Sequence, residues 1–113
     1  MMLDWEKYRQ EVSAATAEMM KISPDIVRGY RTLIAAGSET SVLGAKTREL
    51  ISLAVAVTRQ CDGCIAVHTD AAVKAGATRE EIVEALGVAV AINTGAALVH
   101  SARVMDAYLS KTK

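Results

Sequence analysis

The sequence lacks an excess of charge of either sign. Its 113 residues carry 13 lysines and arginines against 13 aspartates and glutamates, and no run of like charge or low-complexity segment appears. Nucleic acids, anionic membrane surfaces and polyanionic substrates are bound through concentrated basic charge, which this chain does not have. We therefore expect no nucleic-acid partner. The length predicts a single domain over residues 1–113.

Cysteine is scarce, and no apolar leader opens the chain. Two cysteines cannot build the disulfide framework of a small secreted domain. The first residues, Met1–Lys7, turn polar and charged at once, unlike the apolar core of a secretory signal. We therefore expect a cytoplasmic protein. In that reducing compartment a Cys-x-x-Cys pair is more often catalytic or metal-binding than a permanent crosslink.

Strand patterns are also missing. No segment alternates with a period of two, and the Asp62–Gly63 pair lies inside the cysteine motif and not between two strand-like runs. Apolar residues recur instead at helical spacing, so we predict an all-α fold of about six helices. Their predicted bounds are an N-cap at Asp4 to about Met20, Ser23-Pro24 to Gly37, Thr47 to about Arg59, a cap at Asp62 to Gly76, a capping box at Thr78–Glu81 to about Ile92, and a last helix after Gly95.

One long stretch has no formally charged residue. It lies between Glu84 and Arg103 and approaches the roughly 20 residues that a transmembrane helix needs. Asn93-Thr94-Gly95 interrupts it, and His100 lies within it. We interpret the stretch as two buried helices joined by a break, not as a membrane span, and expect His100 to be buried or at an interface.

Two predicted helices are apolar on almost every side, Leu50–Val57 and Ala85–Ile92. A chain of this length cannot easily cover such helices all round with its own residues. Twenty alanines would also let helices approach closely. We therefore predict a homo-oligomer. The alternative is a monomer with two central helices.

The residues with chemical potential are concentrated in Cys61-Asp62-Gly63-Cys64 and His68. Two thiols three residues apart can close a disulfide or share a metal. The N–H groups at a helix start favour thiolate over thiol. In a helix, Cys64 and His68 are at positions i and i+4 and share a face, so the imidazole can exchange a proton with the sulfur.

Three interpretations of this motif remain open from the residues. Cys61, Cys64 and His68 could ligate zinc with His100 or a carboxylate as fourth ligand, although no second Cys-x-x-Cys or His-x-x-x-His exists. The cysteines could be inert core residues, although Asp62 and Gly63 between them favour a helix entry at a surface or cleft. The pair could be redox-active, one thiolate attacking a peroxide or disulfide and the other resolving the product. We favour the redox interpretation.

The spacing of these residues resembles the alkylhydroperoxidase D-like branch of the carboxymuconolactone decarboxylase family. Glu49 precedes the first cysteine by twelve residues, and His68 follows the second by four. The flanking sequence is similar to that family as well, from about Leu43 to Tyr108. The segments that carry the resemblance are Thr47-Arg48-Glu49-Leu50-Ile51-Ser52-Leu53-Ala54 and His68-x-x-x-Ala72-x-x-x-Gly76-Ala77-Thr78-x-x-Glu81-Ile82.

The resemblance implies an all-α fold that forms trimers or hexamers. It implies a thiol peroxidase in which Cys64 attacks the hydroperoxide, Cys61 resolves the product, and Glu49 and His68 relay protons. An external dithiol, a lipoyl protein or a thioredoxin-like protein, would restore the thiols, and no cofactor or metal is expected. The alternatives are a non-redox family member, such as a zinc-binding or scaffold module, or a decarboxylase-like enzyme, although that branch generally lacks the cysteine pair.

A geometric prediction follows for Glu49. On one straight helix, Glu49 and Cys61 would be about 18 Å apart. If the two helices instead fold back antiparallel around Arg59–Gln60, Glu49 comes within about one turn of His68. We therefore predict that Glu49 contacts His68 more directly than it contacts either sulfur.

Overall fold

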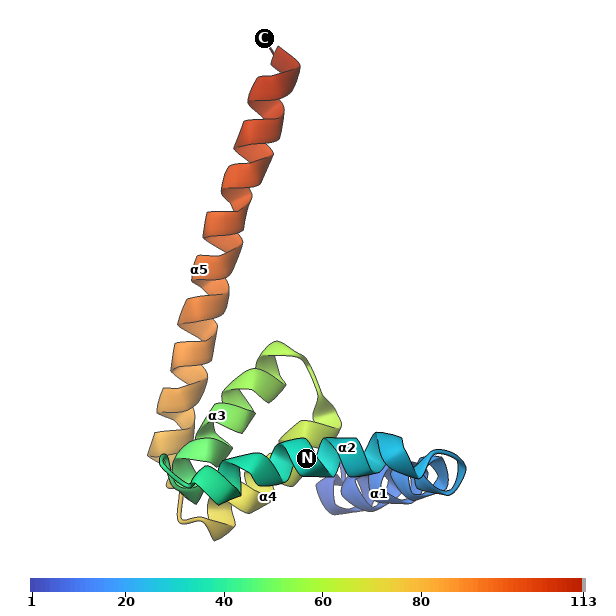
Figure 1. Cartoon of the computed structure of the whole chain (residues 1–113). Helices are drawn as coiled ribbons and strands as arrows, with labels where there is room; N and C mark the ends of the chain where they lie inside the picture. The colour runs from blue at the N-terminus through green and yellow to red at the C-terminus, as the bar shows by residue number, and fades with distance from the viewer. Residues whose placement is uncertain (113) are drawn as a thin grey trace.

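The computed structural model describes residues 1–112, which form five helices and no strand. The first four make two hairpins, and the fifth is a long rod that rises from one end of the body (Figure 1). The predicted all-α class is confirmed, but the number of helices is five and not six. The helices are α1 (Trp5–Ile22), α2 (Pro24–Thr40), α3 (Ala45–Thr58), α4 (Asp62–Lys74) and α5 (Arg79–Thr112).

Two of the predicted helix starts are confirmed by their hydrogen bonds. The Asp4 carboxylate accepts from the backbone N–H of Lys7 at 3.1 Å, which satisfies one of the unpaired donors at the start of α1. At α5, Thr78 and Glu81 each accept from the other's backbone N–H, at 3.0 and 2.9 Å, and so form the predicted capping box. At α2 only half of the prediction holds, because Pro24 opens the helix but the Ser23 side chain makes no capping hydrogen bond.

The predicted role of Gly37 as the end of α2 is wrong. The helix continues to Thr40, and Ser41 takes the left-handed conformation with φ 49°. Gly37 instead allows a close approach, since a Cβ there would lie 2.9 Å from Cδ of Arg48 on α3. The glycine therefore serves the packing of α2 against the Arg48 side chain.

The buried core is small and made mostly of alanine. It comprises Leu53 and Ala56 on α3, Ala66 and Ala72 on α4, and Ala89 on α5. Small side chains let α3 pack closely against both α4 and α5, while α1 packs on α4 and on α2. Gly76, with φ +87°, ends α4 close to its predicted position, because a left-handed residue terminates a helix at little cost when it is glycine.

The predicted break at Asn93-Thr94-Gly95 does not occur, because α5 runs through it without interruption. The polar side chains bond to the helix's own preceding carbonyls: Asn93 donates to Ala89 at 2.7 Å, and Thr94 donates to Val90 at 2.8 Å. Asn93 also donates to the Thr58 hydroxyl at 2.8 Å, which ties α5 to the last residue of α3. Gly95 alone costs a helix only about 1 kcal/mol.

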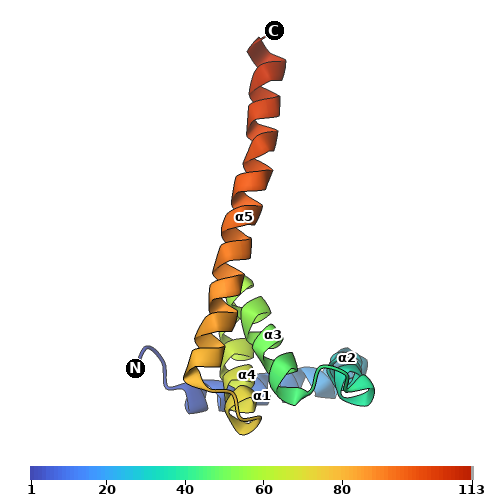
Figure 2. The same cartoon turned by 90° about the vertical axis from the view of Figure 1, so that its left-hand side faces the viewer.

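Beyond Asn93, α5 projects away from the other helices (Figures 1 and 2). Its apolar side chains there are exposed, Leu98 and Val99 at 74% and Met105 at 60%. Among the described residues, α5 is the one helix long and apolar enough to cross a bilayer, a test that core helices of soluble proteins also pass. The single chain therefore does not bury this stretch by itself, and its cover by a partner subunit stays a prediction.

Candidate active site

The two cysteines lie at the start of α4 and are joined in a disulfide. Cys61 has the extended backbone of an N-cap, and its sulfur accepts the backbone N–H of Cys64 at 3.2 Å. The cap predicted at Asp62 is therefore wrong by one residue, because Asp62 is already the first helical residue. The Cys61 sulfur thus belongs to the disulfide and also satisfies a backbone donor at the helix start.

His68 and Glu49 meet between α3 and α4. Nδ1 of His68 lies 2.7 Å from Oε2 of Glu49. The two side chains are only 13% and 23% exposed, so water screens their contact weakly. The predicted contact between these residues is confirmed, across 19 positions of sequence.

The reversal between α3 and α4 brings this contact about. Thr58 ends α3, and Gln60 adopts a left-handed conformation with φ 53°. The Cys61 backbone N–H then donates to Ala56 at 3.1 Å, which fixes the cysteine against the end of α3. The two helices run back along each other as predicted, so Glu49, near the start of α3, reaches His68 in the second turn of α4.

This arrangement suits acid–base chemistry on sulfur. A carboxylate on Nδ1 of His68 orients the ring and leaves Nε2 as the nitrogen available for proton exchange. Cys64 is one helical turn before His68 and on the same face. When the disulfide is reduced, the start of α4 supplies partial positive charge beside both sulfurs.

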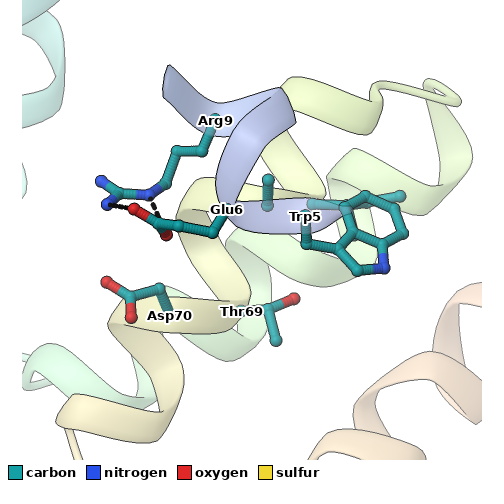
Figure 3. A pocket seen from close by; sticks show the side chains of 7 residues that line it. Trp5, Glu6, Arg9, Thr69 and Asp70 are labelled. Atoms are coloured by element: carbon teal, nitrogen blue, oxygen red, sulfur yellow. Dashed lines mark hydrogen bonds and ion pairs between the residues drawn. The ribbon is translucent and has the colours of Figure 1, made fainter. Parts of the chain in front are cut away.

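A groove between α1 and α4 was not predicted from the sequence, and none of the four predicted site residues lines it. It encloses about 510 Å³, with Ile65 and Ala66 on its apolar side and Trp5 at its edge. Figure 3 shows Glu6 and Arg9 of α1 facing Asp70 of α4. No local pattern could indicate it, because its two walls are about sixty residues apart in sequence.

The charged side chains of the groove are already paired. Arg9 donates twice to Glu6, at 2.7 and 3.1 Å, and this hydrogen bonding lowers the pKa of Glu6 and raises that of Arg9. Lys74 donates to Asp70 at 2.8 Å and lowers the pKa of that carboxyl. Glu6, Arg9 and Asp70 are therefore all paired, and none of them is left free to bind an ionic ligand in the groove.

The second histidine of the chain does not join the cysteine site. His100 is exposed on α5, so it is not buried within the single chain, and the alternative that it lies at an interface stays a prediction. Arg48 lies against Gly37, and its Nη1 is buried without a hydrogen-bond partner. Within residues 1–112, no group of three His, Cys, Asp or Glu side chains is arranged to hold a metal ion.

The chain matches a known protein family. Residues 24–107 match the carboxymuconolactone decarboxylase family. The matched segment begins at α2 and ends in the last turns of α5, so it includes both cysteines, His68 and Glu49.

Similar proteins cover almost the whole chain. An uncharacterized protein of Haemophilus influenzae is 46% identical over 108 residues, 96% of each chain. "Uncharacterized protein 4 in cox locus" of Paracoccus denitrificans is 34% identical over 95 residues, 84% of this chain and 86% of its own. The crystal structure of the apo form of a carboxymuconolactone decarboxylase family protein from Legionella pneumophila has a TM-score of 0.73 and 35% identity, covering 96% of this chain and 97% of its own.

Proposed function

Because this chain belongs to the carboxymuconolactone decarboxylase family and holds a Cys-x-x-Cys disulfide beside a histidine–carboxylate pair, we propose that it is a thiol-dependent peroxidase. The substrate is a hydroperoxide, and an external dithiol supplies the electrons. The observation that carries the proposal is the 2.7 Å contact between His68 and Glu49, one helical turn from Cys64. A purely structural disulfide would have no use for an oriented imidazole beside it.

The chemistry balances with two thiols and one dithiol. The Cys64 thiolate attacks one oxygen of the hydroperoxide, the O–O bond breaks, and the alkoxide leaves as an alcohol after it takes a proton. Cys64 is then a sulfenic acid. The Cys61 thiol condenses with it, releasing water and forming the Cys61–Cys64 disulfide. An external dithiol reduces that disulfide by exchange and is itself oxidised.

His68 is assigned the proton transfers. As a base it accepts the thiol proton of Cys64, and as an acid it returns that proton to the departing oxygen. Glu49 is a positioning residue that acts through His68: it fixes the ring and favours the imidazolium that forms after the first transfer. The limited exposure of both side chains keeps the pair effective in salt.

The decisive experiment counts thiols. The reduced protein is mixed with one equivalent of hydrogen peroxide or tert-butyl hydroperoxide, and free thiols are titrated before and after. We expect two thiols to be lost per chain with no crosslink between chains. Thiols that persist, or crosslinked chains in place of the internal disulfide, would refute the proposal.

Two variants separate the roles of the cysteines. In Cys61→Ser the sulfenic acid of Cys64 should persist and react with a dimedone probe, because no second thiol can resolve it. In Cys64→Ser no sulfenic acid should form at Cys61 at a comparable rate. Equal labelling of the two variants would contradict the assignment of Cys64 as the attacking residue.

The electron donor is proposed by its chemistry, as a lipoyl protein or a thioredoxin-like protein in a cytoplasmic setting. Each is a dithiol that becomes an internal disulfide, so either can reduce the Cys61–Cys64 pair without leaving a mixed disulfide. Steady-state peroxide consumption with a lipoyl protein, thioredoxin or glutathione as donor will rank them. Glutathione is a monothiol, and we expect it to be the slowest.

A further inference from the structure

We infer that the two sulfurs of the disulfide are unequal towards the external dithiol: the dithiol attacks Cys64, and Cys61 departs as a thiolate held at the start of α4. The inference rests on the thiol exchange of the proposed function, but not on a hydroperoxide being the oxidant. It assigns the residue that carries the covalent bond to the electron donor.

The polar surroundings of the two sulfurs differ. The sulfur of Cys61 accepts the backbone N–H of Cys64 at 3.2 Å and so caps a helix of 13 residues. Among residues 1–112, no hydrogen bond reaches the sulfur of Cys64, whose polar neighbour is His68 one turn later. The N–H groups of a helix start favour negative charge on Cys61, whereas an imidazole exchanges protons with Cys64.

The leaving group decides which sulfur is attacked. Exposure does not separate the two, because both cysteines are part-buried. When a thiol attacks a disulfide, the attacked sulfur keeps the new bond, the other takes the electron pair, and the more stable thiolate leaves faster. A hydrogen bond to an ionised group shifts such an equilibrium by about 10- to 150-fold. Cys61 is therefore the better leaving group, and Cys64 is the sulfur attacked.

The backbone of Cys61 keeps the departing sulfur in place. Its N–H donates to Ala56 at 3.1 Å, and its carbonyl accepts the N–H of Ile65 at 2.9 Å. The preceding Gln60 holds a left-handed φ of 53°, which residues with a Cβ seldom adopt. The released sulfur therefore stays beside the N–H that stabilises its charge. It also stays within reach of Cys64, as the resolution of a sulfenic acid requires.

The neighbouring side chains do not offset this difference. Gly63 has no side chain, and Val12 of α1 packs there, 3.7 Å from where a Cβ would lie. Arg59 and Asp62 carry opposite charges and are both exposed, so water screens them. The backbone N–H at the helix start is therefore the group that decides where the negative charge settles.

The exchange balances in two steps. His68 takes the proton of the first donor thiol, whose sulfur bonds to Cys64 while the bond to Cys61 breaks and Cys61 takes the electron pair. The second donor thiol gives its proton through water to Cys61 and attacks the donor sulfur of the mixed disulfide. Cys64 leaves with that electron pair and takes the proton held by His68. The donor ends as an internal disulfide, and the chain holds two thiols.

A trapping experiment on the oxidised full chain tests the assignment. The probe is one equivalent of 2-mercaptoethanol, a small monothiol, and N-ethylmaleimide added at increasing delays blocks the released thiol. Trypsin leaves both cysteines on one peptide, residues 60–74, and fragment masses locate the two labels. Extrapolated to zero delay, mercaptoethanol on Cys64 with maleimide on Cys61 should exceed the reverse by about 10 to 1 or more.

The outcomes separate this inference from the proposed peroxidase. Mercaptoethanol on Cys61, or equal shares at the two positions, in a chain that consumes hydroperoxide would overturn the inference alone. A disulfide that 2-mercaptoethanol does not open would overturn both. Thiols that survive hydroperoxide, while the labels fall as expected, would support the inference and remove the peroxidase proposal.

Two substitutions at one position test the N–H donor itself. Cys64→Ser and Cys64→Pro each leave Cys61 as the only thiol, and proline removes an N–H whose acceptor is the Cys61 sulfur. At pH 6, Cys64→Pro should react with iodoacetamide about 3- to 10-fold more slowly than Cys64→Ser. This ratio is smaller than the loss of thiolate, because a less stabilised thiolate is the stronger nucleophile. Equal rates in two variants of equal helix content, measured by circular dichroism, would overturn the inference, and the trapping result decides if proline unfolds the helix.

Discussion

Replacing the carboxylate behind His68 perturbs the proposed proton relay at a single atom. Glu49→Gln keeps the length and shape of the side chain and removes only its charge. Glu49→Asp keeps the charge but withdraws it by one methylene, about 1.5 Å, from a contact that is now 2.7 Å. The two variants therefore separate the charge of the carboxylate from its reach.

The expected size of the effect follows from the contact. A hydrogen bond to a charged group contributes about 1.5–3 kcal/mol to stability. The two side chains that form this one are largely buried, His68 being 13% and Glu49 23% exposed. If the imidazolium forms fully in the transition state, losing that interaction slows the reaction of reduced protein with hydrogen peroxide by about 10- to 150-fold. Both variants should be slow, Glu49→Gln because the charge is lost and Glu49→Asp because the contact is broken.

The assay is the single-turnover loss of thiols in reduced protein, measured by stopped flow across pH. Because Glu49 acts through His68, the pH profile of the rate should change shape in Glu49→Gln and not only in height. Glu81→Gln is the matched control, since that glutamate binds Lys46 and not His68. A Glu49→Gln rate within twofold of the unmodified protein at every pH would refute the relay.

Two further outcomes follow from the contacts at the helix starts. In reduced protein, Cys61→Ala should unfold at a lower urea concentration than Cys61→Ser, with a difference of about 1 kcal/mol in the free energy of unfolding. The reason is that a serine hydroxyl can accept a hydrogen bond from the backbone N–H of Cys64, whereas alanine cannot. Equal stability of the two variants would contradict a capping role for Cys61. The Lys46 hydrogen bond lowers the pKa of Glu81 to about 2 from 4.5, so its stabilisation is complete above pH 4.5 and is lost as pH falls towards 2. The unmodified protein should therefore lose more stability over that window than Glu81→Gln, and parallel denaturation curves for the two would contradict this.

Much of the candidate site could be predicted from sequence because its determinants are local. A cysteine pair at a helix start, with a histidine one turn later, is fixed by the 3.6-residue period alone. The contact of Glu49 with His68 spans two helices, yet it was predictable because a short reversal at Arg59–Gln60 allows few arrangements. The groove lined by Trp5 and Asp70 was not, because it depends on how α1 lies on α4.

The errors have a common physical cause. Asn93-Thr94-Gly95 and Gly37 predict helix ends because their residue types favour breaks in isolated chains. In the structure, tertiary contacts outweigh those preferences: Asn93 bonds to Thr58, and Gly37 accommodates Arg48. A preference of about 1 kcal/mol is easily outweighed by such packing.

The sequence by itself determined the helical class, the family and the spacing of Cys61, Cys64 and His68, since each depends on residues within a few turns of one another. Only the tertiary structure decided that α5 is one uninterrupted rod and that its far half leaves the body at Asn93. The physical reason is that helix periodicity depends only on neighbouring residues and can be read from the sequence. How much of α5 is covered depends instead on where α3, which packs against it, comes to an end. Beyond the point where α3 stops at Thr58, the apolar side chains of α5 are exposed.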